Sequence, residues 1–400
     1  MLSLIMKRDS LSMKRAREIR ARNQFKRNFR EKPHKHVRKR TFCNVWFRGQ
    51  TWQAEITEPS TIRYYPEELC FDKNPSETLA AIASTRRNLH KNNNYRLWMS
   101  PNLNSDKNLK VKSYIGMDRI REMSTSAALV LAAEYERKLH FMDEPPPLYD
   151  LANWDEGVLN KLFQIGFFER FGYSVVDPKK KPQNDNVLTV PFYSGAKAEM
   201  EKYDQKLVNL VHHIDPDLSL PADMELSLIS ALGEAANNSR EHAYVSHDFK
   251  YPHVNKWWAT GAASKSERAI VVSLFDQGVT IPISYPKLPM FSNLKQKLDL
   301  FDFNRGHEFQ NDARLIQAAT VYGKSGRKTP SGELNSKGGY GLPQIKDAIN
   351  ICGSGSLMIL SRGGKYLYKV HDGKIHEDLT TYPESLGGTL IEWRVNLSNA

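Results

Sequence analysis

Apolar positions in the C-terminal half of the chain change period several times, and each change predicts an element. Residues 269–275 are almost continuously apolar, which predicts a buried strand. Residues 343–349 have apolar positions at helical spacing after a proline that suits a first turn, so they predict a helix. Residues 389–395 alternate between apolar and polar, and residues 357–370 have the pattern of a hairpin. Helices followed by a sheet predict an α/β sandwich for this half.

The segment 233–244 places Glu234, Asn238 and His242 four residues apart, on one face of a predicted helix. Small residues fill much of the space between them, so the backbone could lie close to a ligand. A carboxylate and an amide supply the hard oxygen donors that Mg²⁺ accepts. The face therefore predicts a metal and nucleotide site, although the same spacing also describes an ordinary solvated helix face.

Three glycine-bearing segments follow in order, at 276–282, 338–342 and 387–390. Together with the 233–244 segment they resemble the N box and the three glycine boxes of the GHKL (Bergerat-fold) ATPases, most closely those of the anti-sigma-factor kinases. The resemblance covers residues 191–400, about half of the chain. It departs from the family at Thr280, where the first glycine box usually has its second glycine.

The resemblance implies Mg²⁺ and ATP as ligands. Asn238 would ligate the metal, and Glu234 would orient or deprotonate the nucleophile. Asp276, at the end of a predicted strand, would accept a hydrogen bond from the adenine amino group, and Gly278 would let the purine approach the backbone. A plain Asp-x-Gly turn after a strand is the alternative at this position.

The second glycine box opens the predicted helix 343–349, so its backbone NH groups would face an anion at a helix N-terminus. A mobile lid is implied over residues 322–332, where Lys324 or Arg327 could reach the phosphates or could simply be solvated loop cations. The other nucleotide-binding residues that the resemblance implies are Gly339, Gly341, Leu342 and Thr389.

Residues 43–176 predict a second, smaller α/β domain. It has a helix over 124–135 that opens on hydroxyl caps and another over 158–167. Both features are similar to a divergent STAS domain, the fold of anti-sigma-factor antagonists. In that family a serine at the helix start is phosphorylated by a GHKL-type kinase, and Ser124 is the matching position. Met123 stands where the family usually has an acidic residue, and an ordinary N-cap serine is the alternative.

Composition sets the remaining bounds. The 400 residues are 40% hydrophobic, enough for two domain-sized cores, and no apolar run approaches the ~20 residues of a membrane span. Residues 1–42 hold fifteen Lys or Arg and three acids, which equals the net charge of +12 of the whole chain, so the rest is neutral. The predicted organisation is thus a basic, disordered arm over 1–42, the small domain 43–176, a linker over 177–190 and the ATP-binding domain 191–400.

The arm lacks the apolar core of a secretory signal, so we expect a cytoplasmic protein. It could bind nucleic acid or an anionic membrane by counterion release, or be a solubilising arm. Three widely separated cysteines, an odd number, fit a reducing compartment. His34, His36 and Cys43 lack a fourth ligand for zinc.

The sequence therefore predicts a Mg-ATP-binding protein that acts as an ATPase or a serine/threonine-type regulatory kinase on a regulatory protein partner. The alternatives are a non-catalytic ATP-gated switch or scaffold, and a nucleic-acid-binding protein that uses its basic arm. No dimerisation helix with a phosphoacceptor histidine is evident, which argues against a sensor histidine kinase.

Overall fold

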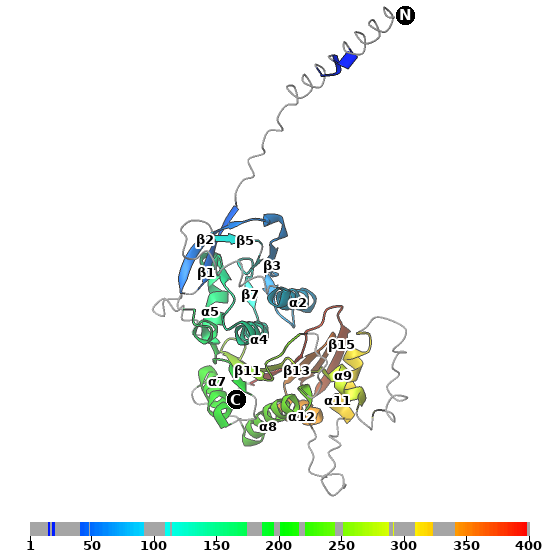
Figure 1. Cartoon of the computed structure of the whole chain (residues 1–400). Coiled ribbons are helices and arrows are strands. Elements are labelled where there is room, and N and C mark those ends of the chain that lie inside the picture. Colours follow the sequence, from blue (N-terminus) through cyan, green and yellow to red (C-terminus); the bar gives the residue numbers. More distant parts are fainter. Residues whose placement is uncertain are drawn as a thin grey trace, which may run out of the picture. The chain divides into compact units, whose positions relative to one another are not determined.

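The protein has two units, Met1–Phe42 and Cys43–Ala400. The structure, a computed structural model, describes residues 15–16, 18–20, 41–47, 49–91, 109–112, 114–173, 186–195, 201–215, 221–244, 251–287, 291, 309–322 and 341–397. Of the described residues of the first unit, 15–16 and 18–20 are helical, and 41–42 begin a strand. The second unit is a mixed α/β structure with several sheets (Figure 1).

The N-terminal part of the second unit is built around a four-stranded sheet in the order β5-β2-β1-β8. Two short parallel pairs, β3 with β6 and β4 with β7, accompany it. Its strands and α-helices are β1 (Thr41–Phe47), β2 (Gln50–Ile56), β3 (Arg63–Tyr64), β4 (Glu68–Leu69), α2 (Pro75–Lys91), β5 (Leu109–Val111), β6 (Ile115–Gly116), β7 (Glu122–Met123), α4 (Thr125–Met142), β8 (Leu148–Tyr149), α5 (Glu156–Gln164) and α6 (Phe167–Arg170).

The C-terminal part is built around an eight-stranded sheet in the order β10-β11-β12-β16-β13-β14-β15, with β9 also paired to β11. All its pairs are antiparallel. Its elements are β9 (Val187–Thr189), β10 (Tyr193–Gly195), α7 (Glu201–Ile214), α8 (Ala222–Asn238), a π-helical turn (Ser239–Ala243), β11 (Trp257–Ser264), β12 (Ala269–Asp276), α9 (Ile281–Ser284), α11 (Asp312–Tyr322), α12 (Gly341–Cys352), β13 (Gly355–Ser361), β14 (Gly364–His371), β15 (Lys374–Thr381) and β16 (Thr389–Asn396).

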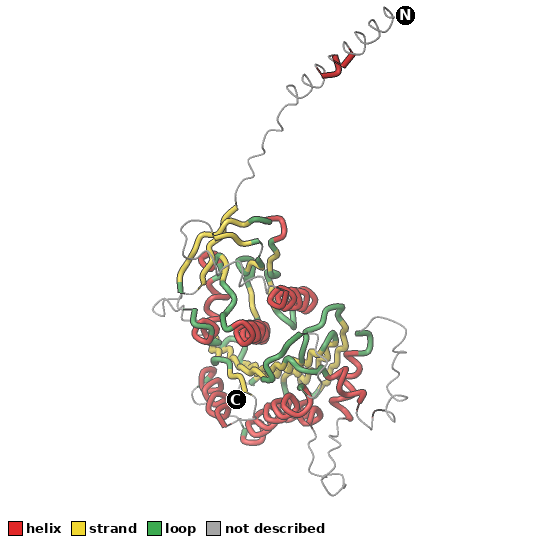
Figure 2. The backbone as a smooth tube through the Cα atoms, viewed as in Figure 1, coloured by secondary structure: helices red, strands yellow, loops and turns green. Residues whose placement is uncertain are grey.

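Helices cover both faces of this large sheet (Figure 2). Helices α7, α8, α11 and α12 contact one face, whereas α4 lies on the other face against β11 and β12. Successive strand residues point to opposite faces, so Trp257 packs with α7, α8 and α12 while Trp258 packs with α4. Because both faces are covered, β12 is apolar almost throughout, as its sequence predicts.

Helix α4 joins the two parts of the second unit through a shared core. Residues 125–138 are all buried, including Glu134 and Glu136, and the same hydrophobic cluster contains Trp258, Phe275 and Leu390 of the large sheet. The region expected to be a linker, 177–190, contributes β9 to the sheet edge beside β11. Residues 43–400 are therefore one compact unit.

The elements predicted from local patterns are confirmed where the structure describes them. The strand over 269–275 is β12, the helix over 343–349 lies in α12, and the hairpin over 357–370 is formed by β13 and β14. Its two-residue turn places Arg362 at φ 54°, in the left-handed region typical of such turns. The helix expected over 158–167 is divided at Gly166, between α5 and α6.

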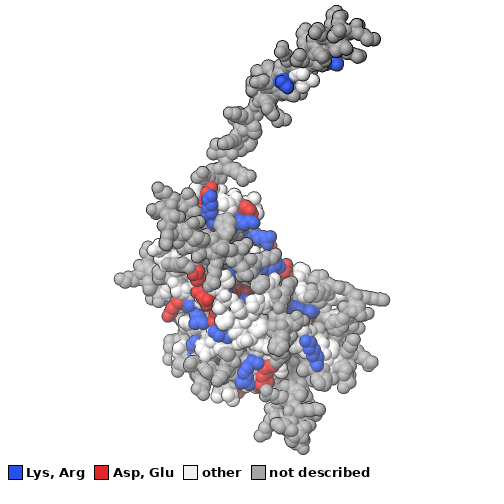
Figure 3. Space-filling model, in the orientation of Figure 1, with Lys and Arg blue, Asp and Glu red and all other residues white. Residues whose placement is uncertain are grey.

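The surface of the second unit shows no concentration of one charge on the face in Figure 3, where the described Lys and Arg side chains are interspersed with Asp and Glu. This agrees with the balanced charge of residues 43–400. The described helices include none that is long and apolar enough to span a membrane. Cys43, Cys70 and Cys352 are free and buried.

Candidate functional site

A row of polar side chains crosses one end of the large sheet. Asp276 is the last residue of β12 and is opposite Thr389 of β16, which is in turn opposite Ser361 of β13. The hydroxyl oxygens of Ser361 and Thr389 are 2.9 Å apart, and the Ser361 hydroxyl accepts a hydrogen bond of 3.0 Å from the Ile281 backbone NH. All three row residues are buried. The antiparallel register thus brings the first and third glycine boxes side by side.

Asp276 is the most constrained member of this row. Its carboxylate accepts hydrogen bonds of 2.9 Å from the Gly278 backbone NH and from the Ser239 hydroxyl. Burial raises the pKa of Asp276 to about 6, and these hydrogen bonds oppose the rise without cancelling it. The carboxylate oxygens retain lone pairs, so Asp276 can accept one more donor from a ligand.

Helix α8 ends in a π-helical turn, within the segment predicted to carry the polar face. The α-helix runs to Asn238, and Ser239–Ala243 then forms a turn with i→i+5 hydrogen bonds. His242 is exposed, whereas Glu234 and Asn238 are half-buried. The alignment of the three side chains on one face stays a prediction.

Asn238 lies against the first residue of α12. A Cβ atom on Gly341, which has a φ of 24°, would be 3.5 Å from the Asn238 Oδ1 atom and 3.6 Å from Nδ2. The Nδ2 atom is buried and has no hydrogen-bond partner among the residues that the structure describes. A buried unpaired amide costs about 1–3 kcal/mol, so this position favours a ligand that supplies the partner. The N-terminus of α12 adds a partial positive charge beside it.

The position of Gly278 has no room for a side chain, which the sequence did not indicate. A Cβ atom at this position would overlap Ala243, whose carbonyl accepts a hydrogen bond of 2.5 Å from the Val279 NH. The absence of a side chain therefore lets the first glycine box pack on the π turn. Thr280, at the position where the resemblance breaks down, has a buried hydroxyl with no partner in the described part of the chain.

Glu234 lies one turn before Asn238 on α8. Burial raises the pKa of Glu234, and the charge of Glu241 adds to this effect. A raised pKa makes the carboxylate a better proton acceptor near neutral pH. Two α8 positions, one a carboxylate and one an amide, therefore face the same neighbourhood.

The other expected site residues divide into three groups. Leu342 and Thr389 are described, and Leu342 packs against a small apolar cluster, as does Ile281 of α9. Ser124 is half-exposed and caps α4, since its hydroxyl accepts a hydrogen bond of 3.2 Å from the Ala127 NH. The predicted residues that lie outside the described part of the chain are Lys324, Arg327, Gly339, the rest of the predicted lid, His34 and His36.

Residues of the N-terminal part of the unit contact the site from the opposite face of the sheet. The Arg86 guanidinium of α2 donates to the backbone carbonyls of Ser385 and Leu386, just before the third glycine box. It also pairs with Glu134 of α4 at 2.8 Å, and all these partners are buried or nearly so. Gln277, the residue after Asp276, donates a hydrogen bond of 2.9 Å to the Ala133 carbonyl of α4.

Sequence reasoning missed Ser239, Ser361 and Arg86 as site residues. Ser239 follows Asn238 directly, so the segment 233–244 contained a signal for it. Ser361 and Arg86 are far from the glycine boxes in sequence and reach them only through strand pairing and core packing. No local pattern could have identified them.

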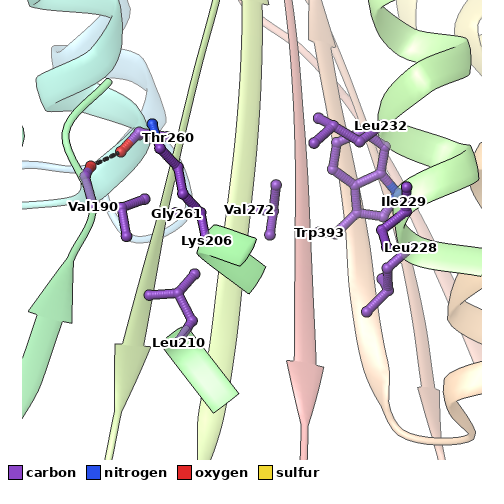
Figure 4. A pocket seen from close by; sticks show the side chains of 10 residues that line it. All are labelled: Val190, Lys206, Leu210, Leu228, Ile229, Leu232, Thr260, Gly261, Val272 and Trp393. Atoms are coloured by element: carbon purple, nitrogen blue, oxygen red, sulfur yellow. Dashed lines mark hydrogen bonds between the residues drawn. The ribbon is translucent and has the colours of Figure 1, made fainter. Parts of the chain in front are cut away.

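A separate apolar hollow lies on the α7 and α8 face of the sheet and does not belong to this site (Figure 4). Its volume of about 30 Å³ is far below the roughly 300 Å³ of a typical small-molecule site. It is lined by Val190, Lys206, Leu210, Leu228, Ile229, Leu232, Thr260, Gly261, Val272 and Trp393.

No protein-family model matches the chain, and no curated protein or solved structure is detectably similar to it. Function must therefore be argued from the site itself. Its chemistry consists of an amide without a partner, a half-buried carboxylate of raised pKa, a buried carboxyl at a strand end, and a helix N-terminus. These are groups for binding a polar, anionic ligand together with a hard cation.

Proposed function

We propose that residues 191–400 bind Mg-ATP in the manner of a GHKL-type (Bergerat-fold) domain and that the protein acts as an ATPase or a regulatory kinase. The observation that supports this best is the proximity of Asn238 to Gly341, next to an Asn238 Nδ2 atom that is buried without a partner among the described residues. The polar row from Asp276 to Thr389 joins the first and third boxes at the same sheet.

The four boxes are far apart in sequence, and the fold gives each of them a neighbour from the set. Helix α8 packs on α12, and the Gln344 side chain donates a hydrogen bond of 2.6 Å to the Ser230 hydroxyl between them. A helix pair on one face of an antiparallel sheet, with the boxes at its ends, is the arrangement that the resemblance implies. The proposal extends to residues 43–176 as a STAS-like partner module, with Ser124 as a possible phosphoacceptor.

Each residue has a defined task in this proposal. The Asn238 amide oxygen would hold Mg²⁺, which when bound would offset the charge of the phosphates. The Asp276 carboxylate accepts a hydrogen bond from the adenine amino group, and Thr389 beside it offers a hydroxyl. Backbone NH groups at the start of α12 bind phosphate oxygens. Glu234 orients the nucleophile and accepts its proton, aided by its raised pKa.

Calorimetry with Asn238→Ala tests the binding site. Alanine cannot supply the metal ligand, so Mg²⁺-dependent ATP binding should be lost while the fold is retained. Asn237→Ala is the matched control, because the neighbouring amide projects about 100° away around the helix. Unchanged ATP affinity in Asn238→Ala, or equal losses in both variants, would remove the basis of the site assignment.

A non-catalytic ATP-gated switch is the second candidate, and a specific observation favours it. Arg86 and Gln277 connect α2 and α4 directly to the segments beside Gly388 and Asp276. A nucleotide that shifts these segments would therefore also shift α2 and α4 in the N-terminal part of the unit, without any chemical step. Signalling would then follow from occupancy alone.

Glu234→Gln separates the enzyme from the switch. The amide keeps the size and polarity of the side chain but cannot take a proton, so ATP affinity should stay within about threefold while hydrolysis or phosphotransfer is lost. Steady-state turnover and ATP calorimetry on the same preparation measure both quantities. If the unmodified protein binds ATP and shows no turnover, with or without a candidate partner, the switch is the better description.

A further inference from the structure

A second and much larger cavity lies in the N-terminal part of the unit. Its volume is about 360 Å³, within the range of small-molecule sites. Its walls come from α2, α4, β3, β8 and the segments between the short strands, and none of its described lining residues belongs to the nucleotide site proposed above. A ligand here would therefore occupy a different site from ATP.

Positive charge surrounds this cavity. Arg63, Lys112 and Lys138 line it from three separate segments, and the described lining includes one carboxylate, Glu58. Glu58 pairs with Lys112 at 3.5 Å on the exposed rim. Arg63 donates to a neutral partner, the Ser84 hydroxyl, at 3.2 Å. The described lining thus has a net positive charge, which favours an anionic ligand.

Lys138 makes the inner wall of the cavity basic. Its side chain is only 8% exposed, and its ammonium donates a hydrogen bond of 3.0 Å to the Leu89 carbonyl. Burial lowers the pKa of Lys138, because few water molecules can solvate the charge. An anion in the cavity would stabilise the charged ammonium at this depth, where screening is weak.

Aromatic rings form much of the remaining wall. Tyr114 and Tyr149 stack with their ring centroids 4.4 Å apart and an angle of 13° between the planes. The Tyr114 hydroxyl donates to Asp150 at 2.7 Å, which fixes the ring. Tyr65 and Tyr135 line the buried side, with the Tyr65 and Thr85 hydroxyls 2.5 Å apart. Rigid rings of this kind pack well against a planar ligand.

The walls are held in place by backbone hydrogen bonds. Residues 57–65 run alongside residues 111–112 and 114–116. The backbone NH groups of Glu58, Arg63 and Tyr65 donate to the carbonyls of Lys112, Tyr114 and Gly116, respectively. A cavity fixed by such a ladder exists before its ligand arrives, so little ordering accompanies binding.

From this geometry we propose that the cavity binds a small organic anion with one planar ring. The anionic group contacts Lys138, with Arg63 and Lys112 at the entrance. The ring packs among the tyrosines. An aromatic carboxylate and a nucleoside monophosphate share this chemistry and fit a cavity of this size.

Calorimetry on the full chain, with 4-hydroxybenzoate, uridine 5′-monophosphate and inorganic phosphate as separate probes, tests the proposal. At least one ring-bearing anion should bind more tightly than phosphate, and which one binds identifies the anionic group. Lys138→Met should weaken that binding about tenfold, because it removes a charge-assisted contact of low solvent exposure. Asn238→Ala should leave it unchanged, since the two sites are separate.

Lys112→Gln provides a second variant with less risk to folding, because Lys112 is on the exposed rim; we expect a loss of about threefold. Its matched control is Lys110→Gln, which changes an exposed lysine two residues away that is outside the cavity. The proposal is overturned if no ring-bearing anion binds at about 5 mM, if phosphate binds equally well, or if the lining variants and Lys110→Gln behave alike.

Discussion

At the residue scale, Asp276 shows how the fold sets the protonation of a candidate adenine contact. Its carboxyl is buried at a strand end, and hydrogen bonds from Gly278 and Ser239 stabilise the charged form without fully offsetting the loss of water. A pKa raised to about 6 means that the folded protein holds this proton more tightly than the unfolded chain does. The contribution of Asp276 to stability therefore falls as pH rises from about 4 to about 6, and is constant above that range.

Asp276→Asn removes this titration. Between about pH 4.5 and pH 7, we expect the unmodified protein to lose stability relative to the variant, as measured by the free energy of unfolding. The reason is that only the unmodified protein ionises a buried carboxyl in this range. Urea denaturation at both pH values measures it. Binding should show the opposite trend, with ATP affinity of the unmodified protein falling below about pH 6 as the acceptor is protonated. If the unmodified protein and the variant differed in unfolding free energy by the same amount at both pH values, Asp276 would not be a buried carboxyl that ionises in this range.

At the element scale, the helices of the N-terminal part hold the ends of the C-terminal sheet. Glu136 of α4 accepts hydrogen bonds from Trp258 and Lys256 near β11 and from Arg170 of α6. Burial opposes ionisation of this carboxyl, but the three donors outweigh it and hold the pKa of Glu136 below its usual value. On α2, Arg86 is similarly placed between Glu134 and the carbonyl of Leu386. These contacts make α2 and α4 structural parts of the sheet they cover.

Two adjacent arginines of α2 allow a matched comparison. Arg86 is 4% exposed and shares the fully buried Glu134 with Arg137. Arg86→Met should lower the unfolding free energy by about 1–3 kcal/mol, because Glu134 keeps Arg137 as a partner but the buried Leu386 carbonyl loses its donor. Arg87 pairs with Glu384 at 3.1 Å, but both side chains are more than one-third exposed. Arg87→Met should therefore cost less than about 1 kcal/mol. Chemical denaturation of both variants provides the measurement, and similar losses would show that burial does not distinguish the two pairs.

At the scale of the whole molecule, charge and fold are separated along the chain. Residues 1–42 hold the entire net charge, whereas residues 43–400 form one compact unit with 42 residues of each sign. A basic segment of this kind binds polyanions through released counterions, largely without sequence preference. The third candidate function, binding of nucleic acid or an anionic surface, therefore depends on a different part of the protein from the proposed ATP site.

Deleting residues 1–42 should abolish binding to DNA, RNA or anionic vesicles and leave ATP affinity unchanged. If about six cations contact phosphates, binding by the full chain should weaken roughly a thousandfold between about 50 and 200 mM salt. Fluorescence anisotropy with labelled DNA and RNA over this salt range measures the loss of binding on deletion and the salt dependence of binding by the full chain. Equal nucleic-acid binding by the truncated protein would assign the interface to residues 43–400 instead, and the arm would be a solubilising segment.

The sequence by itself determined which stretches become strands and helices in the C-terminal part, and in what order the glycine boxes occur. These features are local: an apolar run, a helical period or a two-residue turn depends on neighbours a few positions away. Asn238, Asp276, Gly341 and Thr389 could therefore be named as candidates before any coordinates were known, and the fold brings each of them beside another member of the set.

Only the tertiary structure decided how those candidates are held. Ala243 of the π turn packs against Gly278, a contact that no helical period can predict. The bond from Arg86 to Leu386 joins residues 300 positions apart. Burial of α4 between two sheets, and the cavity that Lys138 lines, likewise depend on segments distant in sequence, because cores and cavities form where separate elements meet.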